Sequence, residues 1–346
     1  MILIDAVYIN NSGGKILLQY LIDSIFFKKI NNAFYFLLDD RFSYDTLDQI
    51  PTENKLAIKG GEANRISFYK KNGMKFNILF CFANVPPPLK FFNKKVIIYF
   101  HNALILDNND KNLALIQRVS FKLKKAYIKY KSHKNYMWVV QTKHMRDLLI
   151  NNLAINNEMI KTLPIYDVEK FSGLNFQLSK NDSNYLYVAD GVKQKNHDLL
   201  LKAWEIIFDS HELELTLHLT VPSRYKILCN EITRLVNKGV LIVNHGHCTF
   251  EELKSLYTNC NYFLMPSLSE SFGLPLIEAA SAGCEIIAVE LEYVHDVVEP
   301  MMSFCDTADA MDLVSCILSA HNHKKCTRLI VKDEMDSLLN LLTTNA

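Results

Sequence analysis

Short apolar runs alternate with helix-like segments along this chain, and the alternation runs through two successive series. In the first series, strands are expected at 2–7, 34–38, 77–82, 95–100 and 137–141, and helices at 15–30, 112–131 and 143–152. In the second, strands are expected at 184–189, 214–220, 240–243 and 262–265, and helices from 197, at 224–237 and at 275–282. Such short apolar runs suit parallel strands that are covered on both faces. The pattern therefore predicts an α/β fold of two doubly wound Rossmann-like domains that face a central cleft.

A chain of 346 residues is long for one hydrophobic core, and its apolar fraction of 49% favours a folded globular protein. The polar segment 151–183 contains the expected connection between the two domains. We therefore place an N-terminal domain at 1–165 and a C-terminal domain at 166–346. The helices expected between 306 and 342 cover the second sheet, and the last of them is free to cross back to the first domain.

Eight cysteines are scattered through the sequence, and none forms a Cys-x-x-Cys pair. This spacing indicates neither a zinc site nor a disulfide framework, so we expect reduced thiols in a cytoplasmic protein. Apolar runs such as 96–100 are too short to cross a bilayer. The first residues lack the basic lead of a signal peptide and fit a first strand instead.

The net charge of +1 conceals a division between the two halves. Residues 1–165 carry 24 Lys and Arg against 12 Asp and Glu, whereas residues 166–346 carry 14 against 25. In the basic half, the segment 116–134 combines apolar residues at helical spacing with lysines: Ile116, Val119, Leu123, Tyr127 and Tyr130 with Lys122, Lys124, Lys125, Lys129, Lys131 and Lys134. Such a helix can dock on anionic lipid, although a solvated face on a core helix would show the same pattern. The imbalance of the whole half favours an anionic membrane surface as the partner, on the inner face of the cytoplasmic membrane. Because no nucleic-acid-binding motif is found, we expect no nucleic acid partner.

A strand, a polar loop and a helix follow one another over 262–283. Pro275 suits a first helical turn, so the helix begins directly behind the loop. The backbone amides of Phe272, Gly273 and Leu274 then lie at the positive end of the helix, where they can hold a phosphate.

Two carboxylates flank this helix start. Glu278 lies one turn inside the helix, where it can bind both hydroxyls of a ribose. Glu270 lies in the loop, free to meet a second sugar. A phosphate site between two carboxylates that bind hydroxyl groups predicts a nucleotide-sugar site, whereas the alternative is an ordinary amphipathic helix behind a buried strand.

The Glu270 to Glu278 segment, with its Phe-Gly-Leu-Pro core, resembles the signature of the retaining glycosyltransferases of family 4, the group 1 transferases. The resemblance is strong over 184–298 and weak over the first 165 residues. It implies a GT-B fold in which a UDP- or GDP-sugar binds mainly to the C-terminal domain, with Ser271 among the donor-binding residues, and the acceptor binds to the N-terminal domain. It also implies front-face transfer, in which Glu270 orients the sugar and the leaving phosphate helps to deprotonate the acceptor. The expected acceptor is a glycan or a polyprenyl-diphosphate-linked saccharide in bacterial surface polysaccharide synthesis.

A second landmark of the same family is a glycine, a short loop and Lys-Asn-His before a helix, found here from Gly191 to Lys195 and onward. The resemblance implies that Lys195 neutralises the donor diphosphate as its leaving charge grows. Other members place an arginine a few residues earlier, where this chain has Asp190. We take Lys193 as the candidate for the missing second cation.

Weaker candidates follow the strands of the first half. Gly13 and Gly14 open a helix and would let a phosphate or an acceptor sugar approach closely. A simple tight turn is the alternative, but the resemblance favours the site because family members have small glycines in this first loop. Asp39 and Asp40 end the second strand where a dehydrogenase would bind a ribose, but the first loop lacks Gly-x-Gly-x-x-Gly. His101 follows the strand at 95–100, where family members often have a histidine that points into the cleft. The resemblance implies a catalytic residue whose imidazole hydrogen-bonds a donor-sugar hydroxyl or the attacked face. A structural histidine is an equal alternative there.

Gly246 lies in the loop 245–247, which in relatives contacts the nucleobase through the main chain. Its two flanking histidines lack a nearby cysteine or carboxylate partner and make a poor metal site. Asp-x-Asp, which clamps a metal and a diphosphate in the other major glycosyltransferase fold, does not occur. We therefore expect no metal cofactor.

Two rival functions share the predicted architecture. A GT-B sugar-nucleotide epimerase needs no acceptor, and the basic first half argues against it because a soluble epimerase needs no anionic surface. A non-catalytic, transferase-like scaffold would not need Glu270, Lys195 and Glu278 together.

Overall fold

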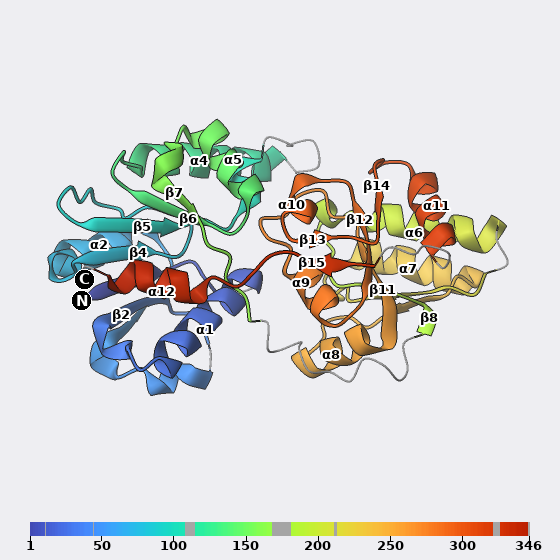
Figure 1. Cartoon of the computed structure of the whole chain (residues 1–346), viewed down its shortest axis with the longest axis horizontal. Helices are drawn as coiled ribbons and strands as arrows, with labels where there is room; N and C mark the ends of the chain where they lie inside the picture. Colours follow the sequence, from blue (N-terminus) through green and yellow to red (C-terminus); the bar gives the residue numbers. More distant parts are fainter. Residues whose placement is uncertain are drawn as a thin grey trace. The chain divides into compact units, whose positions relative to one another are not determined.

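The computed structural model describes residues 1–10, 12–43, 45–107, 115–167, 181–210, 213–320 and 326–344. Within these ranges the chain forms two compact units, each with its own parallel sheet (Figure 1). The first unit comprises residues 1–107, 115–167 and 332–344, and the second comprises the described residues between 181 and 331. The predicted α/β class with two doubly wound sheets is confirmed. The middle of the predicted connecting segment, 168–180, and the predicted helical residues 112–114 lie outside the described ranges.

The first unit is built on seven parallel strands in the order β3-β2-β1-β4-β5-β6-β7. Their bounds are β1 Ile2–Ala6, β2 Phe34–Asp39, β3 Lys55–Ile58, β4 Ile78–Cys81, β5 Lys95–Tyr99, β6 Met137–Val140 and β7 Ile160–Thr162. All of β1 is buried, as expected for an apolar strand inside a doubly wound sheet. The strand order reverses between β1 and β4, so the loops behind these strands border a topological switch point.

The helices of the first unit are α1 Ser12–Phe27, α2 Glu62–Asn72, α3 Ala103–Leu106, α4 Leu115–Lys131, α5 Lys143–Leu153 and α12 Met335–Thr343. Short 3-10 turns are η1 Asn31–Ala33, η2 Asp45–Gln49, η3 Thr52–Asn54, η4 Gly73–Lys75 and η6 Asn157–Met159. α5 shows how local sequence sets the bounds: the Thr142 hydroxyl accepts a hydrogen bond from the Met145 amide at 3.1 Å and caps the first turn. The helix ends at Ala154, which has a left-handed φ of 56°.

The chain end returns to the first unit through α12 (Figure 1). The helix buries one apolar face, made by Met335, Leu338, Leu339 and Leu342. Just before it, Asp333 accepts hydrogen bonds from the Tyr20 hydroxyl at 2.9 Å and the Tyr166 amide at 3.0 Å. Residues 332–344 therefore belong to the first unit, whereas the sequence assigned everything after 165 to the second domain and left only the course of the last helix open.

The second unit is built on six parallel strands in the order β10-β9-β8-β11-β12-β14. Their bounds are β8 Asn181–Tyr187, β9 Thr216–Leu219, β10 Ile242–Asn244, β11 Cys260–Met265, β12 Glu285–Val289 and β14 Met302–Phe304. A small antiparallel pair is formed by β13 Val298–Glu299 and β15 Arg328–Leu329. The strand order reverses between β8 and β11, so the loops that follow these two strands share one switch point.

The helices of the second unit are α6 His197–Ser210, α7 Lys226–Lys238, α8 Phe250–Asn259, α9 Leu274–Ser281, α10 Glu292–His295 and α11 Ala310–Ala320, with the 3-10 turn η7 Lys193–Lys195. A capping box between Thr249 and Glu252 starts α8. The core includes Trp204 of α6, which packs edge-on against Tyr185 of β8 with ring centroids 5.4 Å apart.

The elements that escaped the sequence prediction include β3, β7, β12, β14, α2 and α8. No helix in the described ranges combines the length and the apolar character that crossing a bilayer requires.

Candidate functional site

α9 begins directly behind the loop that follows β11, where the sequence predicted a phosphate site. Gly273 caps the helix with a φ of 74°, a left-handed value that glycine adopts without strain. Pro275 follows in the first turn, where its missing N–H costs no helical hydrogen bond. The loop is completed by Ser271 and by Phe272, which is buried. The Leu274 amide comes before the first helical hydrogen bond and lies at the positive end of the helix, whereas the Leu276 amide donates to the Gly273 carbonyl oxygen at 2.8 Å.

Glu278 lies one turn into α9 and is held by α8. Its Oε2 accepts a hydrogen bond from the Tyr257 hydroxyl at 2.8 Å. Tyr257 is fully buried, and its burial, reinforced by the charge of Glu278, raises the pKa of the phenol well above its usual value. The phenol therefore remains a donor. A carboxylate with one oxygen anchored in this way still has acceptor capacity for the hydroxyls of a ligand.

Lys195 and Glu270 form an ion pair that joins the loop behind β8 to the loop behind β11. Their side chains are 21% and 15% exposed, so the pair is only partly reached by solvent. The buried Ser267 hydroxyl donates to Oε1 of Glu270 at 2.7 Å. The sequence predicted both residues for the donor site but left Glu270 free in its loop. In the structure this carboxylate already has two partners.

Two buried tyrosines donate side-chain hydrogen bonds to the backbone around this ion pair. The Tyr187 hydroxyl donates to the carbonyl oxygen of Lys195 at 2.7 Å. The Tyr293 hydroxyl donates to the carbonyl oxygen of Ser267 at 2.6 Å. Burial, with a smaller contribution from Glu270, raises the pKa of both phenols well above their usual value. Sequence reasoning missed these tyrosines because no motif marks them.

Asn196 connects η7 to α6 in a left-handed conformation with a φ of 54°, which asparagine tolerates better than most residues. Its amide Nδ2 donates to the carbonyl oxygen of Thr307 at 3.0 Å and so ties the Lys195 turn to the loop behind β14. The next residue, His197, is buried, and neither ring nitrogen has a hydrogen-bond partner among the described residues. Burial, assisted by the charge of Lys195, lowers the pKa of His197 to about 4.

The loop behind β8 also contains Asp190, in the region where relatives place an arginine. The structure pairs Asp190 with Arg224, whose Nη2 lies 2.7 Å from Oδ1 of the carboxylate. Lys193, the predicted replacement, is exposed in η7. Gly191 is required sterically, because a Cβ there would lie 2.6 Å from Cγ of Tyr225. Sequence reasoning missed Arg224, which follows β9 and belongs to no recognised motif.

The loop behind β10 contains Gly246, whose φ of 74° favours glycine although a Cβ would meet no atom within 4 Å. Next to it, Nε2 of His245 lies 3.0 Å from Nδ1 of His218 on β9, with the two rings nearly parallel. Burial lowers the pKa of both histidines. In the part of the chain that the structure describes, no three His, Cys, Asp or Glu side chains are grouped to hold a metal ion.

In the first unit, His101 follows β5 and lies beside the start of α1. Its ring Nε2 lies 3.0 Å from the carbonyl oxygen of Phe82, and its amide donates to Oδ1 of Asn84 at 2.6 Å. Burial lowers the pKa of His101 to about 4, so the imidazole is neutral near pH 7. Gly14 and Gly13 form the first turn of α1, and a Cβ on Gly14 would lie 3.1 Å from Cε1 of His101. The structure thus brings these three candidates together.

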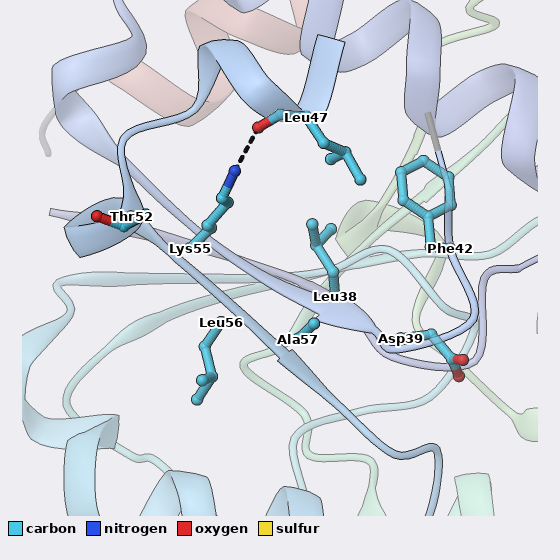
Figure 2. Close-up of a pocket in the computed structure, with 8 residues that line it drawn as sticks. All are labelled: Leu38, Asp39, Phe42, Leu47, Thr52, Lys55, Leu56 and Ala57. Carbon is cyan, nitrogen blue, oxygen red and sulfur yellow. Dashed lines mark hydrogen bonds between the residues drawn. The ribbon is translucent and has the colours of Figure 1, made fainter. Parts of the chain in front are cut away.

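Asp39, the acid that a dehydrogenase would use for a ribose, is already occupied. Its carboxylate accepts hydrogen bonds from Nε and Nη2 of Arg41 at 2.7 and 2.9 Å and from the Tyr8 amide at 3.1 Å. The Arg41 hydrogen bond is the main cause that lowers the pKa of Asp39. Figure 2 shows the mainly apolar pocket of about 290 Å³ beside it, lined by Leu38, Asp39, Phe42, Leu47, Thr52, Lys55, Leu56 and Ala57. These contacts argue further against a dinucleotide site.

α4 has the basic amphipathic sequence, and much of its apolar face is exposed. The exposed fractions are 84% for Ile116, 51% for Val119, 66% for Leu123 and 70% for Tyr130. Exposed lysines on the helix include Lys122, Lys124 and Lys129. Lys125 and Lys131 instead donate to Oδ1 of Asn152 and the carbonyl oxygen of Pro88. The helix packs inward through residues such as the buried Ile128.

Comparison with known sequences identifies the second unit. The family model for glycosyl transferases group 1 matches residues 175–332. The O-antigen chain mannosyltransferase RfbU of Salmonella typhimurium is 25% identical over 217 residues, which cover 60% of this chain and 60% of that protein. The capsular polysaccharide biosynthesis glycosyltransferase CapH of Staphylococcus aureus is 24% identical over 227 residues, covering 59% and 62%. The matches to these two curated relatives thus span only about three fifths of their length.

Solved structures share the whole architecture at low sequence identity. HepE of Anabaena, in complex with UDP and glucose, aligns with a TM-score of 0.65 at 13% identity and covers 99% of this chain and 94% of its own. Sucrose-phosphate synthase of Thermosynechococcus elongatus aligns with a TM-score of 0.69 at 15% identity, covering 93% and 89%. This likeness shows the fold, which is the predicted GT-B fold. Residues 175–332, less than half of the chain, match the family of glycosyl transferases group 1, and the fold agrees with that match.

Proposed function

We propose that this protein is a retaining glycosyltransferase, which moves a hexosyl group from a nucleotide-sugar to a glycan or a lipid-linked saccharide during synthesis of a bacterial surface polysaccharide. The observation that carries the proposal is the Lys195–Glu270 ion pair behind β8 and β11, at the switch point of the second sheet. The names of the relatives support the setting, since RfbU acts on an O-antigen chain and CapH belongs to capsule biosynthesis.

The donor occupies the second unit. Its diphosphate lies against the first amides of α9, and Glu278 accepts hydrogen bonds from the ribose hydroxyls. When the donor binds, the ion pair between Lys195 and Glu270 separates. The Lys195 ammonium then binds the diphosphate, and the Glu270 carboxylate binds hydroxyls of the donor sugar. Gly246 contributes main-chain contacts to the nucleobase.

The transfer breaks the bond between the anomeric carbon and the oxygen of the β-phosphate. The acceptor oxygen forms its new bond on the same face, and its proton passes to the leaving phosphate oxygen. Lys195 and the α9 amides stabilise the charge that develops on the nucleoside diphosphate. Because these groups supply positive charge, we expect the reaction to need no divalent metal. In the first unit, the neutral His101 and the start of α1 at Gly13 and Gly14 bind the acceptor.

A donor panel tests this proposal. The purified protein is incubated with UDP- and GDP-hexoses, with and without a lipid-linked saccharide, in the presence of EDTA. UDP is the nucleotide in the HepE complex, and GDP is the alternative. The expected result is acceptor-dependent release of nucleoside diphosphate and a product whose anomeric configuration, read by NMR, matches that of the donor. An inverted product would contradict retention, and donor epimerisation without an acceptor would favour the epimerase.

The protein works on the inner face of the cytoplasmic membrane and docks there through α4. This part of the proposal rests on the apolar side chains that α4 exposes beside Lys122, Lys124 and Lys129. Each basic residue near an anionic bilayer surface contributes about 1 kcal/mol, and the apolar side chains add burial at the interface.

Sedimentation with vesicles tests the membrane part separately. The triple variant Lys122→Glu, Lys124→Glu, Lys129→Glu should leave phosphatidylglycerol vesicles, while the matched triple variant Lys59→Glu, Lys70→Glu, Lys71→Glu, also in the first unit, should stay bound. Added salt should release the wild type. Both variants should keep normal turnover of a water-soluble acceptor. Equal sedimentation of the wild type with anionic and neutral vesicles would refute docking without touching the catalytic proposal.

A further inference from the structure

The Asp190–Arg224 ion pair joins the loops behind two neighbouring strands of the second sheet. β8 and β9 are parallel, with Tyr185 opposite Leu217, so their carboxyl ends lie at the same edge of the sheet. Asp190 follows β8 and Arg224 follows β9, and their side-chain atoms approach to 2.7 Å. Arg224 therefore lies beside the loop that leads from β8 to Lys195, and is held to it through Asp190.

Close packing of the Tyr225 side chain against Gly191 positions the neighbouring Arg224. The ring of Tyr225 covers Gly191 so closely that a Cβ on that glycine would lie 2.6 Å from the ring. The guanidinium of Arg224 lies over the same ring, 4.9 Å from its centroid. At the base of the two loops, the Ala189 amide donates to the Thr220 hydroxyl at 3.2 Å. These contacts hold the loop behind β9 against the loop behind β8. The side chain of Arg224 nevertheless remains 61% exposed and is accessible to a ligand.

The charge balance of the site calls for a further cation. A nucleoside diphosphate carries two to three negative charges, and the charge of Lys195 is already balanced by Glu270. In the described loops 188–196 and 220–225, the other cations are Lys193 and Arg224. Arg224 is the better diphosphate ligand, because a guanidinium donates two parallel hydrogen bonds to phosphate oxygens whereas an ammonium acts as a point charge.

We propose that Arg224 is the second cation for the donor diphosphate, and that Asp190 holds it in place until the donor arrives. The inference rests on the proposed function and adds a residue and a partner exchange to it. Replacing the Asp190 carboxylate by a phosphate as the partner of Arg224 costs little free energy. The Asp190–Arg224 pair is exposed and therefore weak, whereas charge-assisted hydrogen bonds to a phosphate are strong. Asp190 thus keeps Arg224 oriented without competing effectively against a diphosphate.

Calorimetric titration of the full chain with UDP, GDP and the corresponding nucleosides tests the inference. Arg224→Gln should weaken binding of the nucleoside diphosphate about 10- to 100-fold and leave nucleoside binding unchanged. Arg224→Lys should recover part of the loss, because it restores the charge without the fork. Asp190→Asn should bind the diphosphate at least as tightly as the wild type. The matched control is Arg234→Gln, which removes a comparably exposed, ion-paired arginine on α7 and should change nothing.

Wild-type affinity for the diphosphate in Arg224→Gln would overturn the inference, and so would a loss confined to Lys193→Gln. These outcomes leave the proposed function intact, since the wild type would still bind the diphosphate and transfer sugar. Failure of the wild type to bind either UDP or GDP would overturn the proposed function, and this inference with it.

Discussion

Each unit of the molecule contains an ion pair between residues far apart in the sequence, but the two pairs have different surroundings. In the first unit, Arg65 and Asp5 approach to 2.7 Å with side chains that are 1% and 0% exposed. In the second unit, Lys195 and Glu270 are 21% and 15% exposed. The first pair is a part of the core, and the second is within reach of solvent and ligands.

Hydrogen-bond saturation separates the two pairs further. Arg65 also donates to the Pro86 carbonyl oxygen at 3.2 Å and to Glu62 at 3.0 Å, and Asp5 accepts from the Tyr69 hydroxyl at 2.8 Å. A buried pair survives only with such additional partners, because desolvation of the two charges is costly. It therefore orders the scaffold. A partly exposed pair with few partners can exchange them for ligand groups, which is what the proposed mechanism asks of Lys195 and Glu270.

The largest expected effect comes from breaking the buried pair. Arg65→Met leaves the Asp5 carboxylate buried without its cation and should lower the free energy of unfolding of the first unit by about 3–5 kcal/mol. The chain has two tryptophans, Trp138 in the first unit and Trp204 in the second, so tryptophan fluorescence in a Trp204→Phe background reports on the first unit alone. Adding Asp5→Asn should recover much of the loss. If the unfolding midpoint of Arg65→Met lay at the same denaturant concentration as that of the wild type, the ion pair would not contribute to the stability of the first unit.

Breaking the exposed pair should affect turnover rather than folding. Lys195→Ala removes the ammonium that stabilises the departing diphosphate and should lower kcat roughly 100- to 1,000-fold. Unfolding followed through Trp204 should change by less than about 0.5 kcal/mol beyond the exposed Lys202→Ala control. If Lys195→Ala kept a normal kcat, another cation would stabilise the departing diphosphate. If the variant lost much of its free energy of unfolding, the Lys195–Glu270 pair would be structural, like the Arg65–Asp5 pair.

Glu278 offers a test in which the ligand is changed as well as the protein. Glu278→Ala, made together with Tyr257→Phe so that no buried hydroxyl loses its acceptor, should weaken nucleoside diphosphate binding by about 1.5–3 kcal/mol. The wild type should prefer the ribonucleotide over its 2′-deoxy form in calorimetry, and the variant should lose this preference. Tyr257→Phe alone is the control. A preference that persisted in the double variant would remove Glu278 from the ribose site.

The smallest expected effect concerns His197, beside Lys195. Its pKa of about 4 in the folded state lies below the usual value near 6.5, so the unfolded chain binds a proton more readily between these values. The contribution of His197 to the free energy of unfolding is therefore fully present above pH 6.5 and is lost as the pH falls towards 4. Between pH 7 and pH 5, the Trp204 transition of the wild type should lose about 1–2 kcal/mol more than that of His197→Phe. Parallel pH profiles would show that His197 is not buried in its neutral form.

Local patterns predicted most of the fold. Apolar runs such as those of β1, β5 and β11 identify strands covered on both faces, and Gly273 with Pro275 marks the start of α9. β3 escaped because it is a half-exposed edge strand whose residues Lys55–Ile58 form no apolar run. α2 escaped for a related reason: most of its residues are polar, and its buried side chains include Arg65.

The candidate site was predicted in its parts but not in its contacts. The motifs placed Lys195 and Glu270 near one donor, yet their pairing depends on how two loops 75 residues apart fold against each other. Asp190 and Arg224 meet for the same kind of reason. For α4, the spacing of its apolar residues allows more than one buried face, and the neighbouring elements select the one that contains Ile128.

The return of α12 to the first unit has a consequence for the order in which the protein is made. Between 167 and 332 the chain leaves the first unit, builds the second and then comes back, so the second unit is an insertion within the first. During synthesis on the ribosome, the first unit cannot be completed until all of the second unit has been translated. Until then, Tyr20 lacks its hydrogen-bond partner Asp333, and the Lys95 ammonium lacks the Leu341 carbonyl oxygen. Of the two units, the first therefore starts to be synthesised before the second and is completed after it.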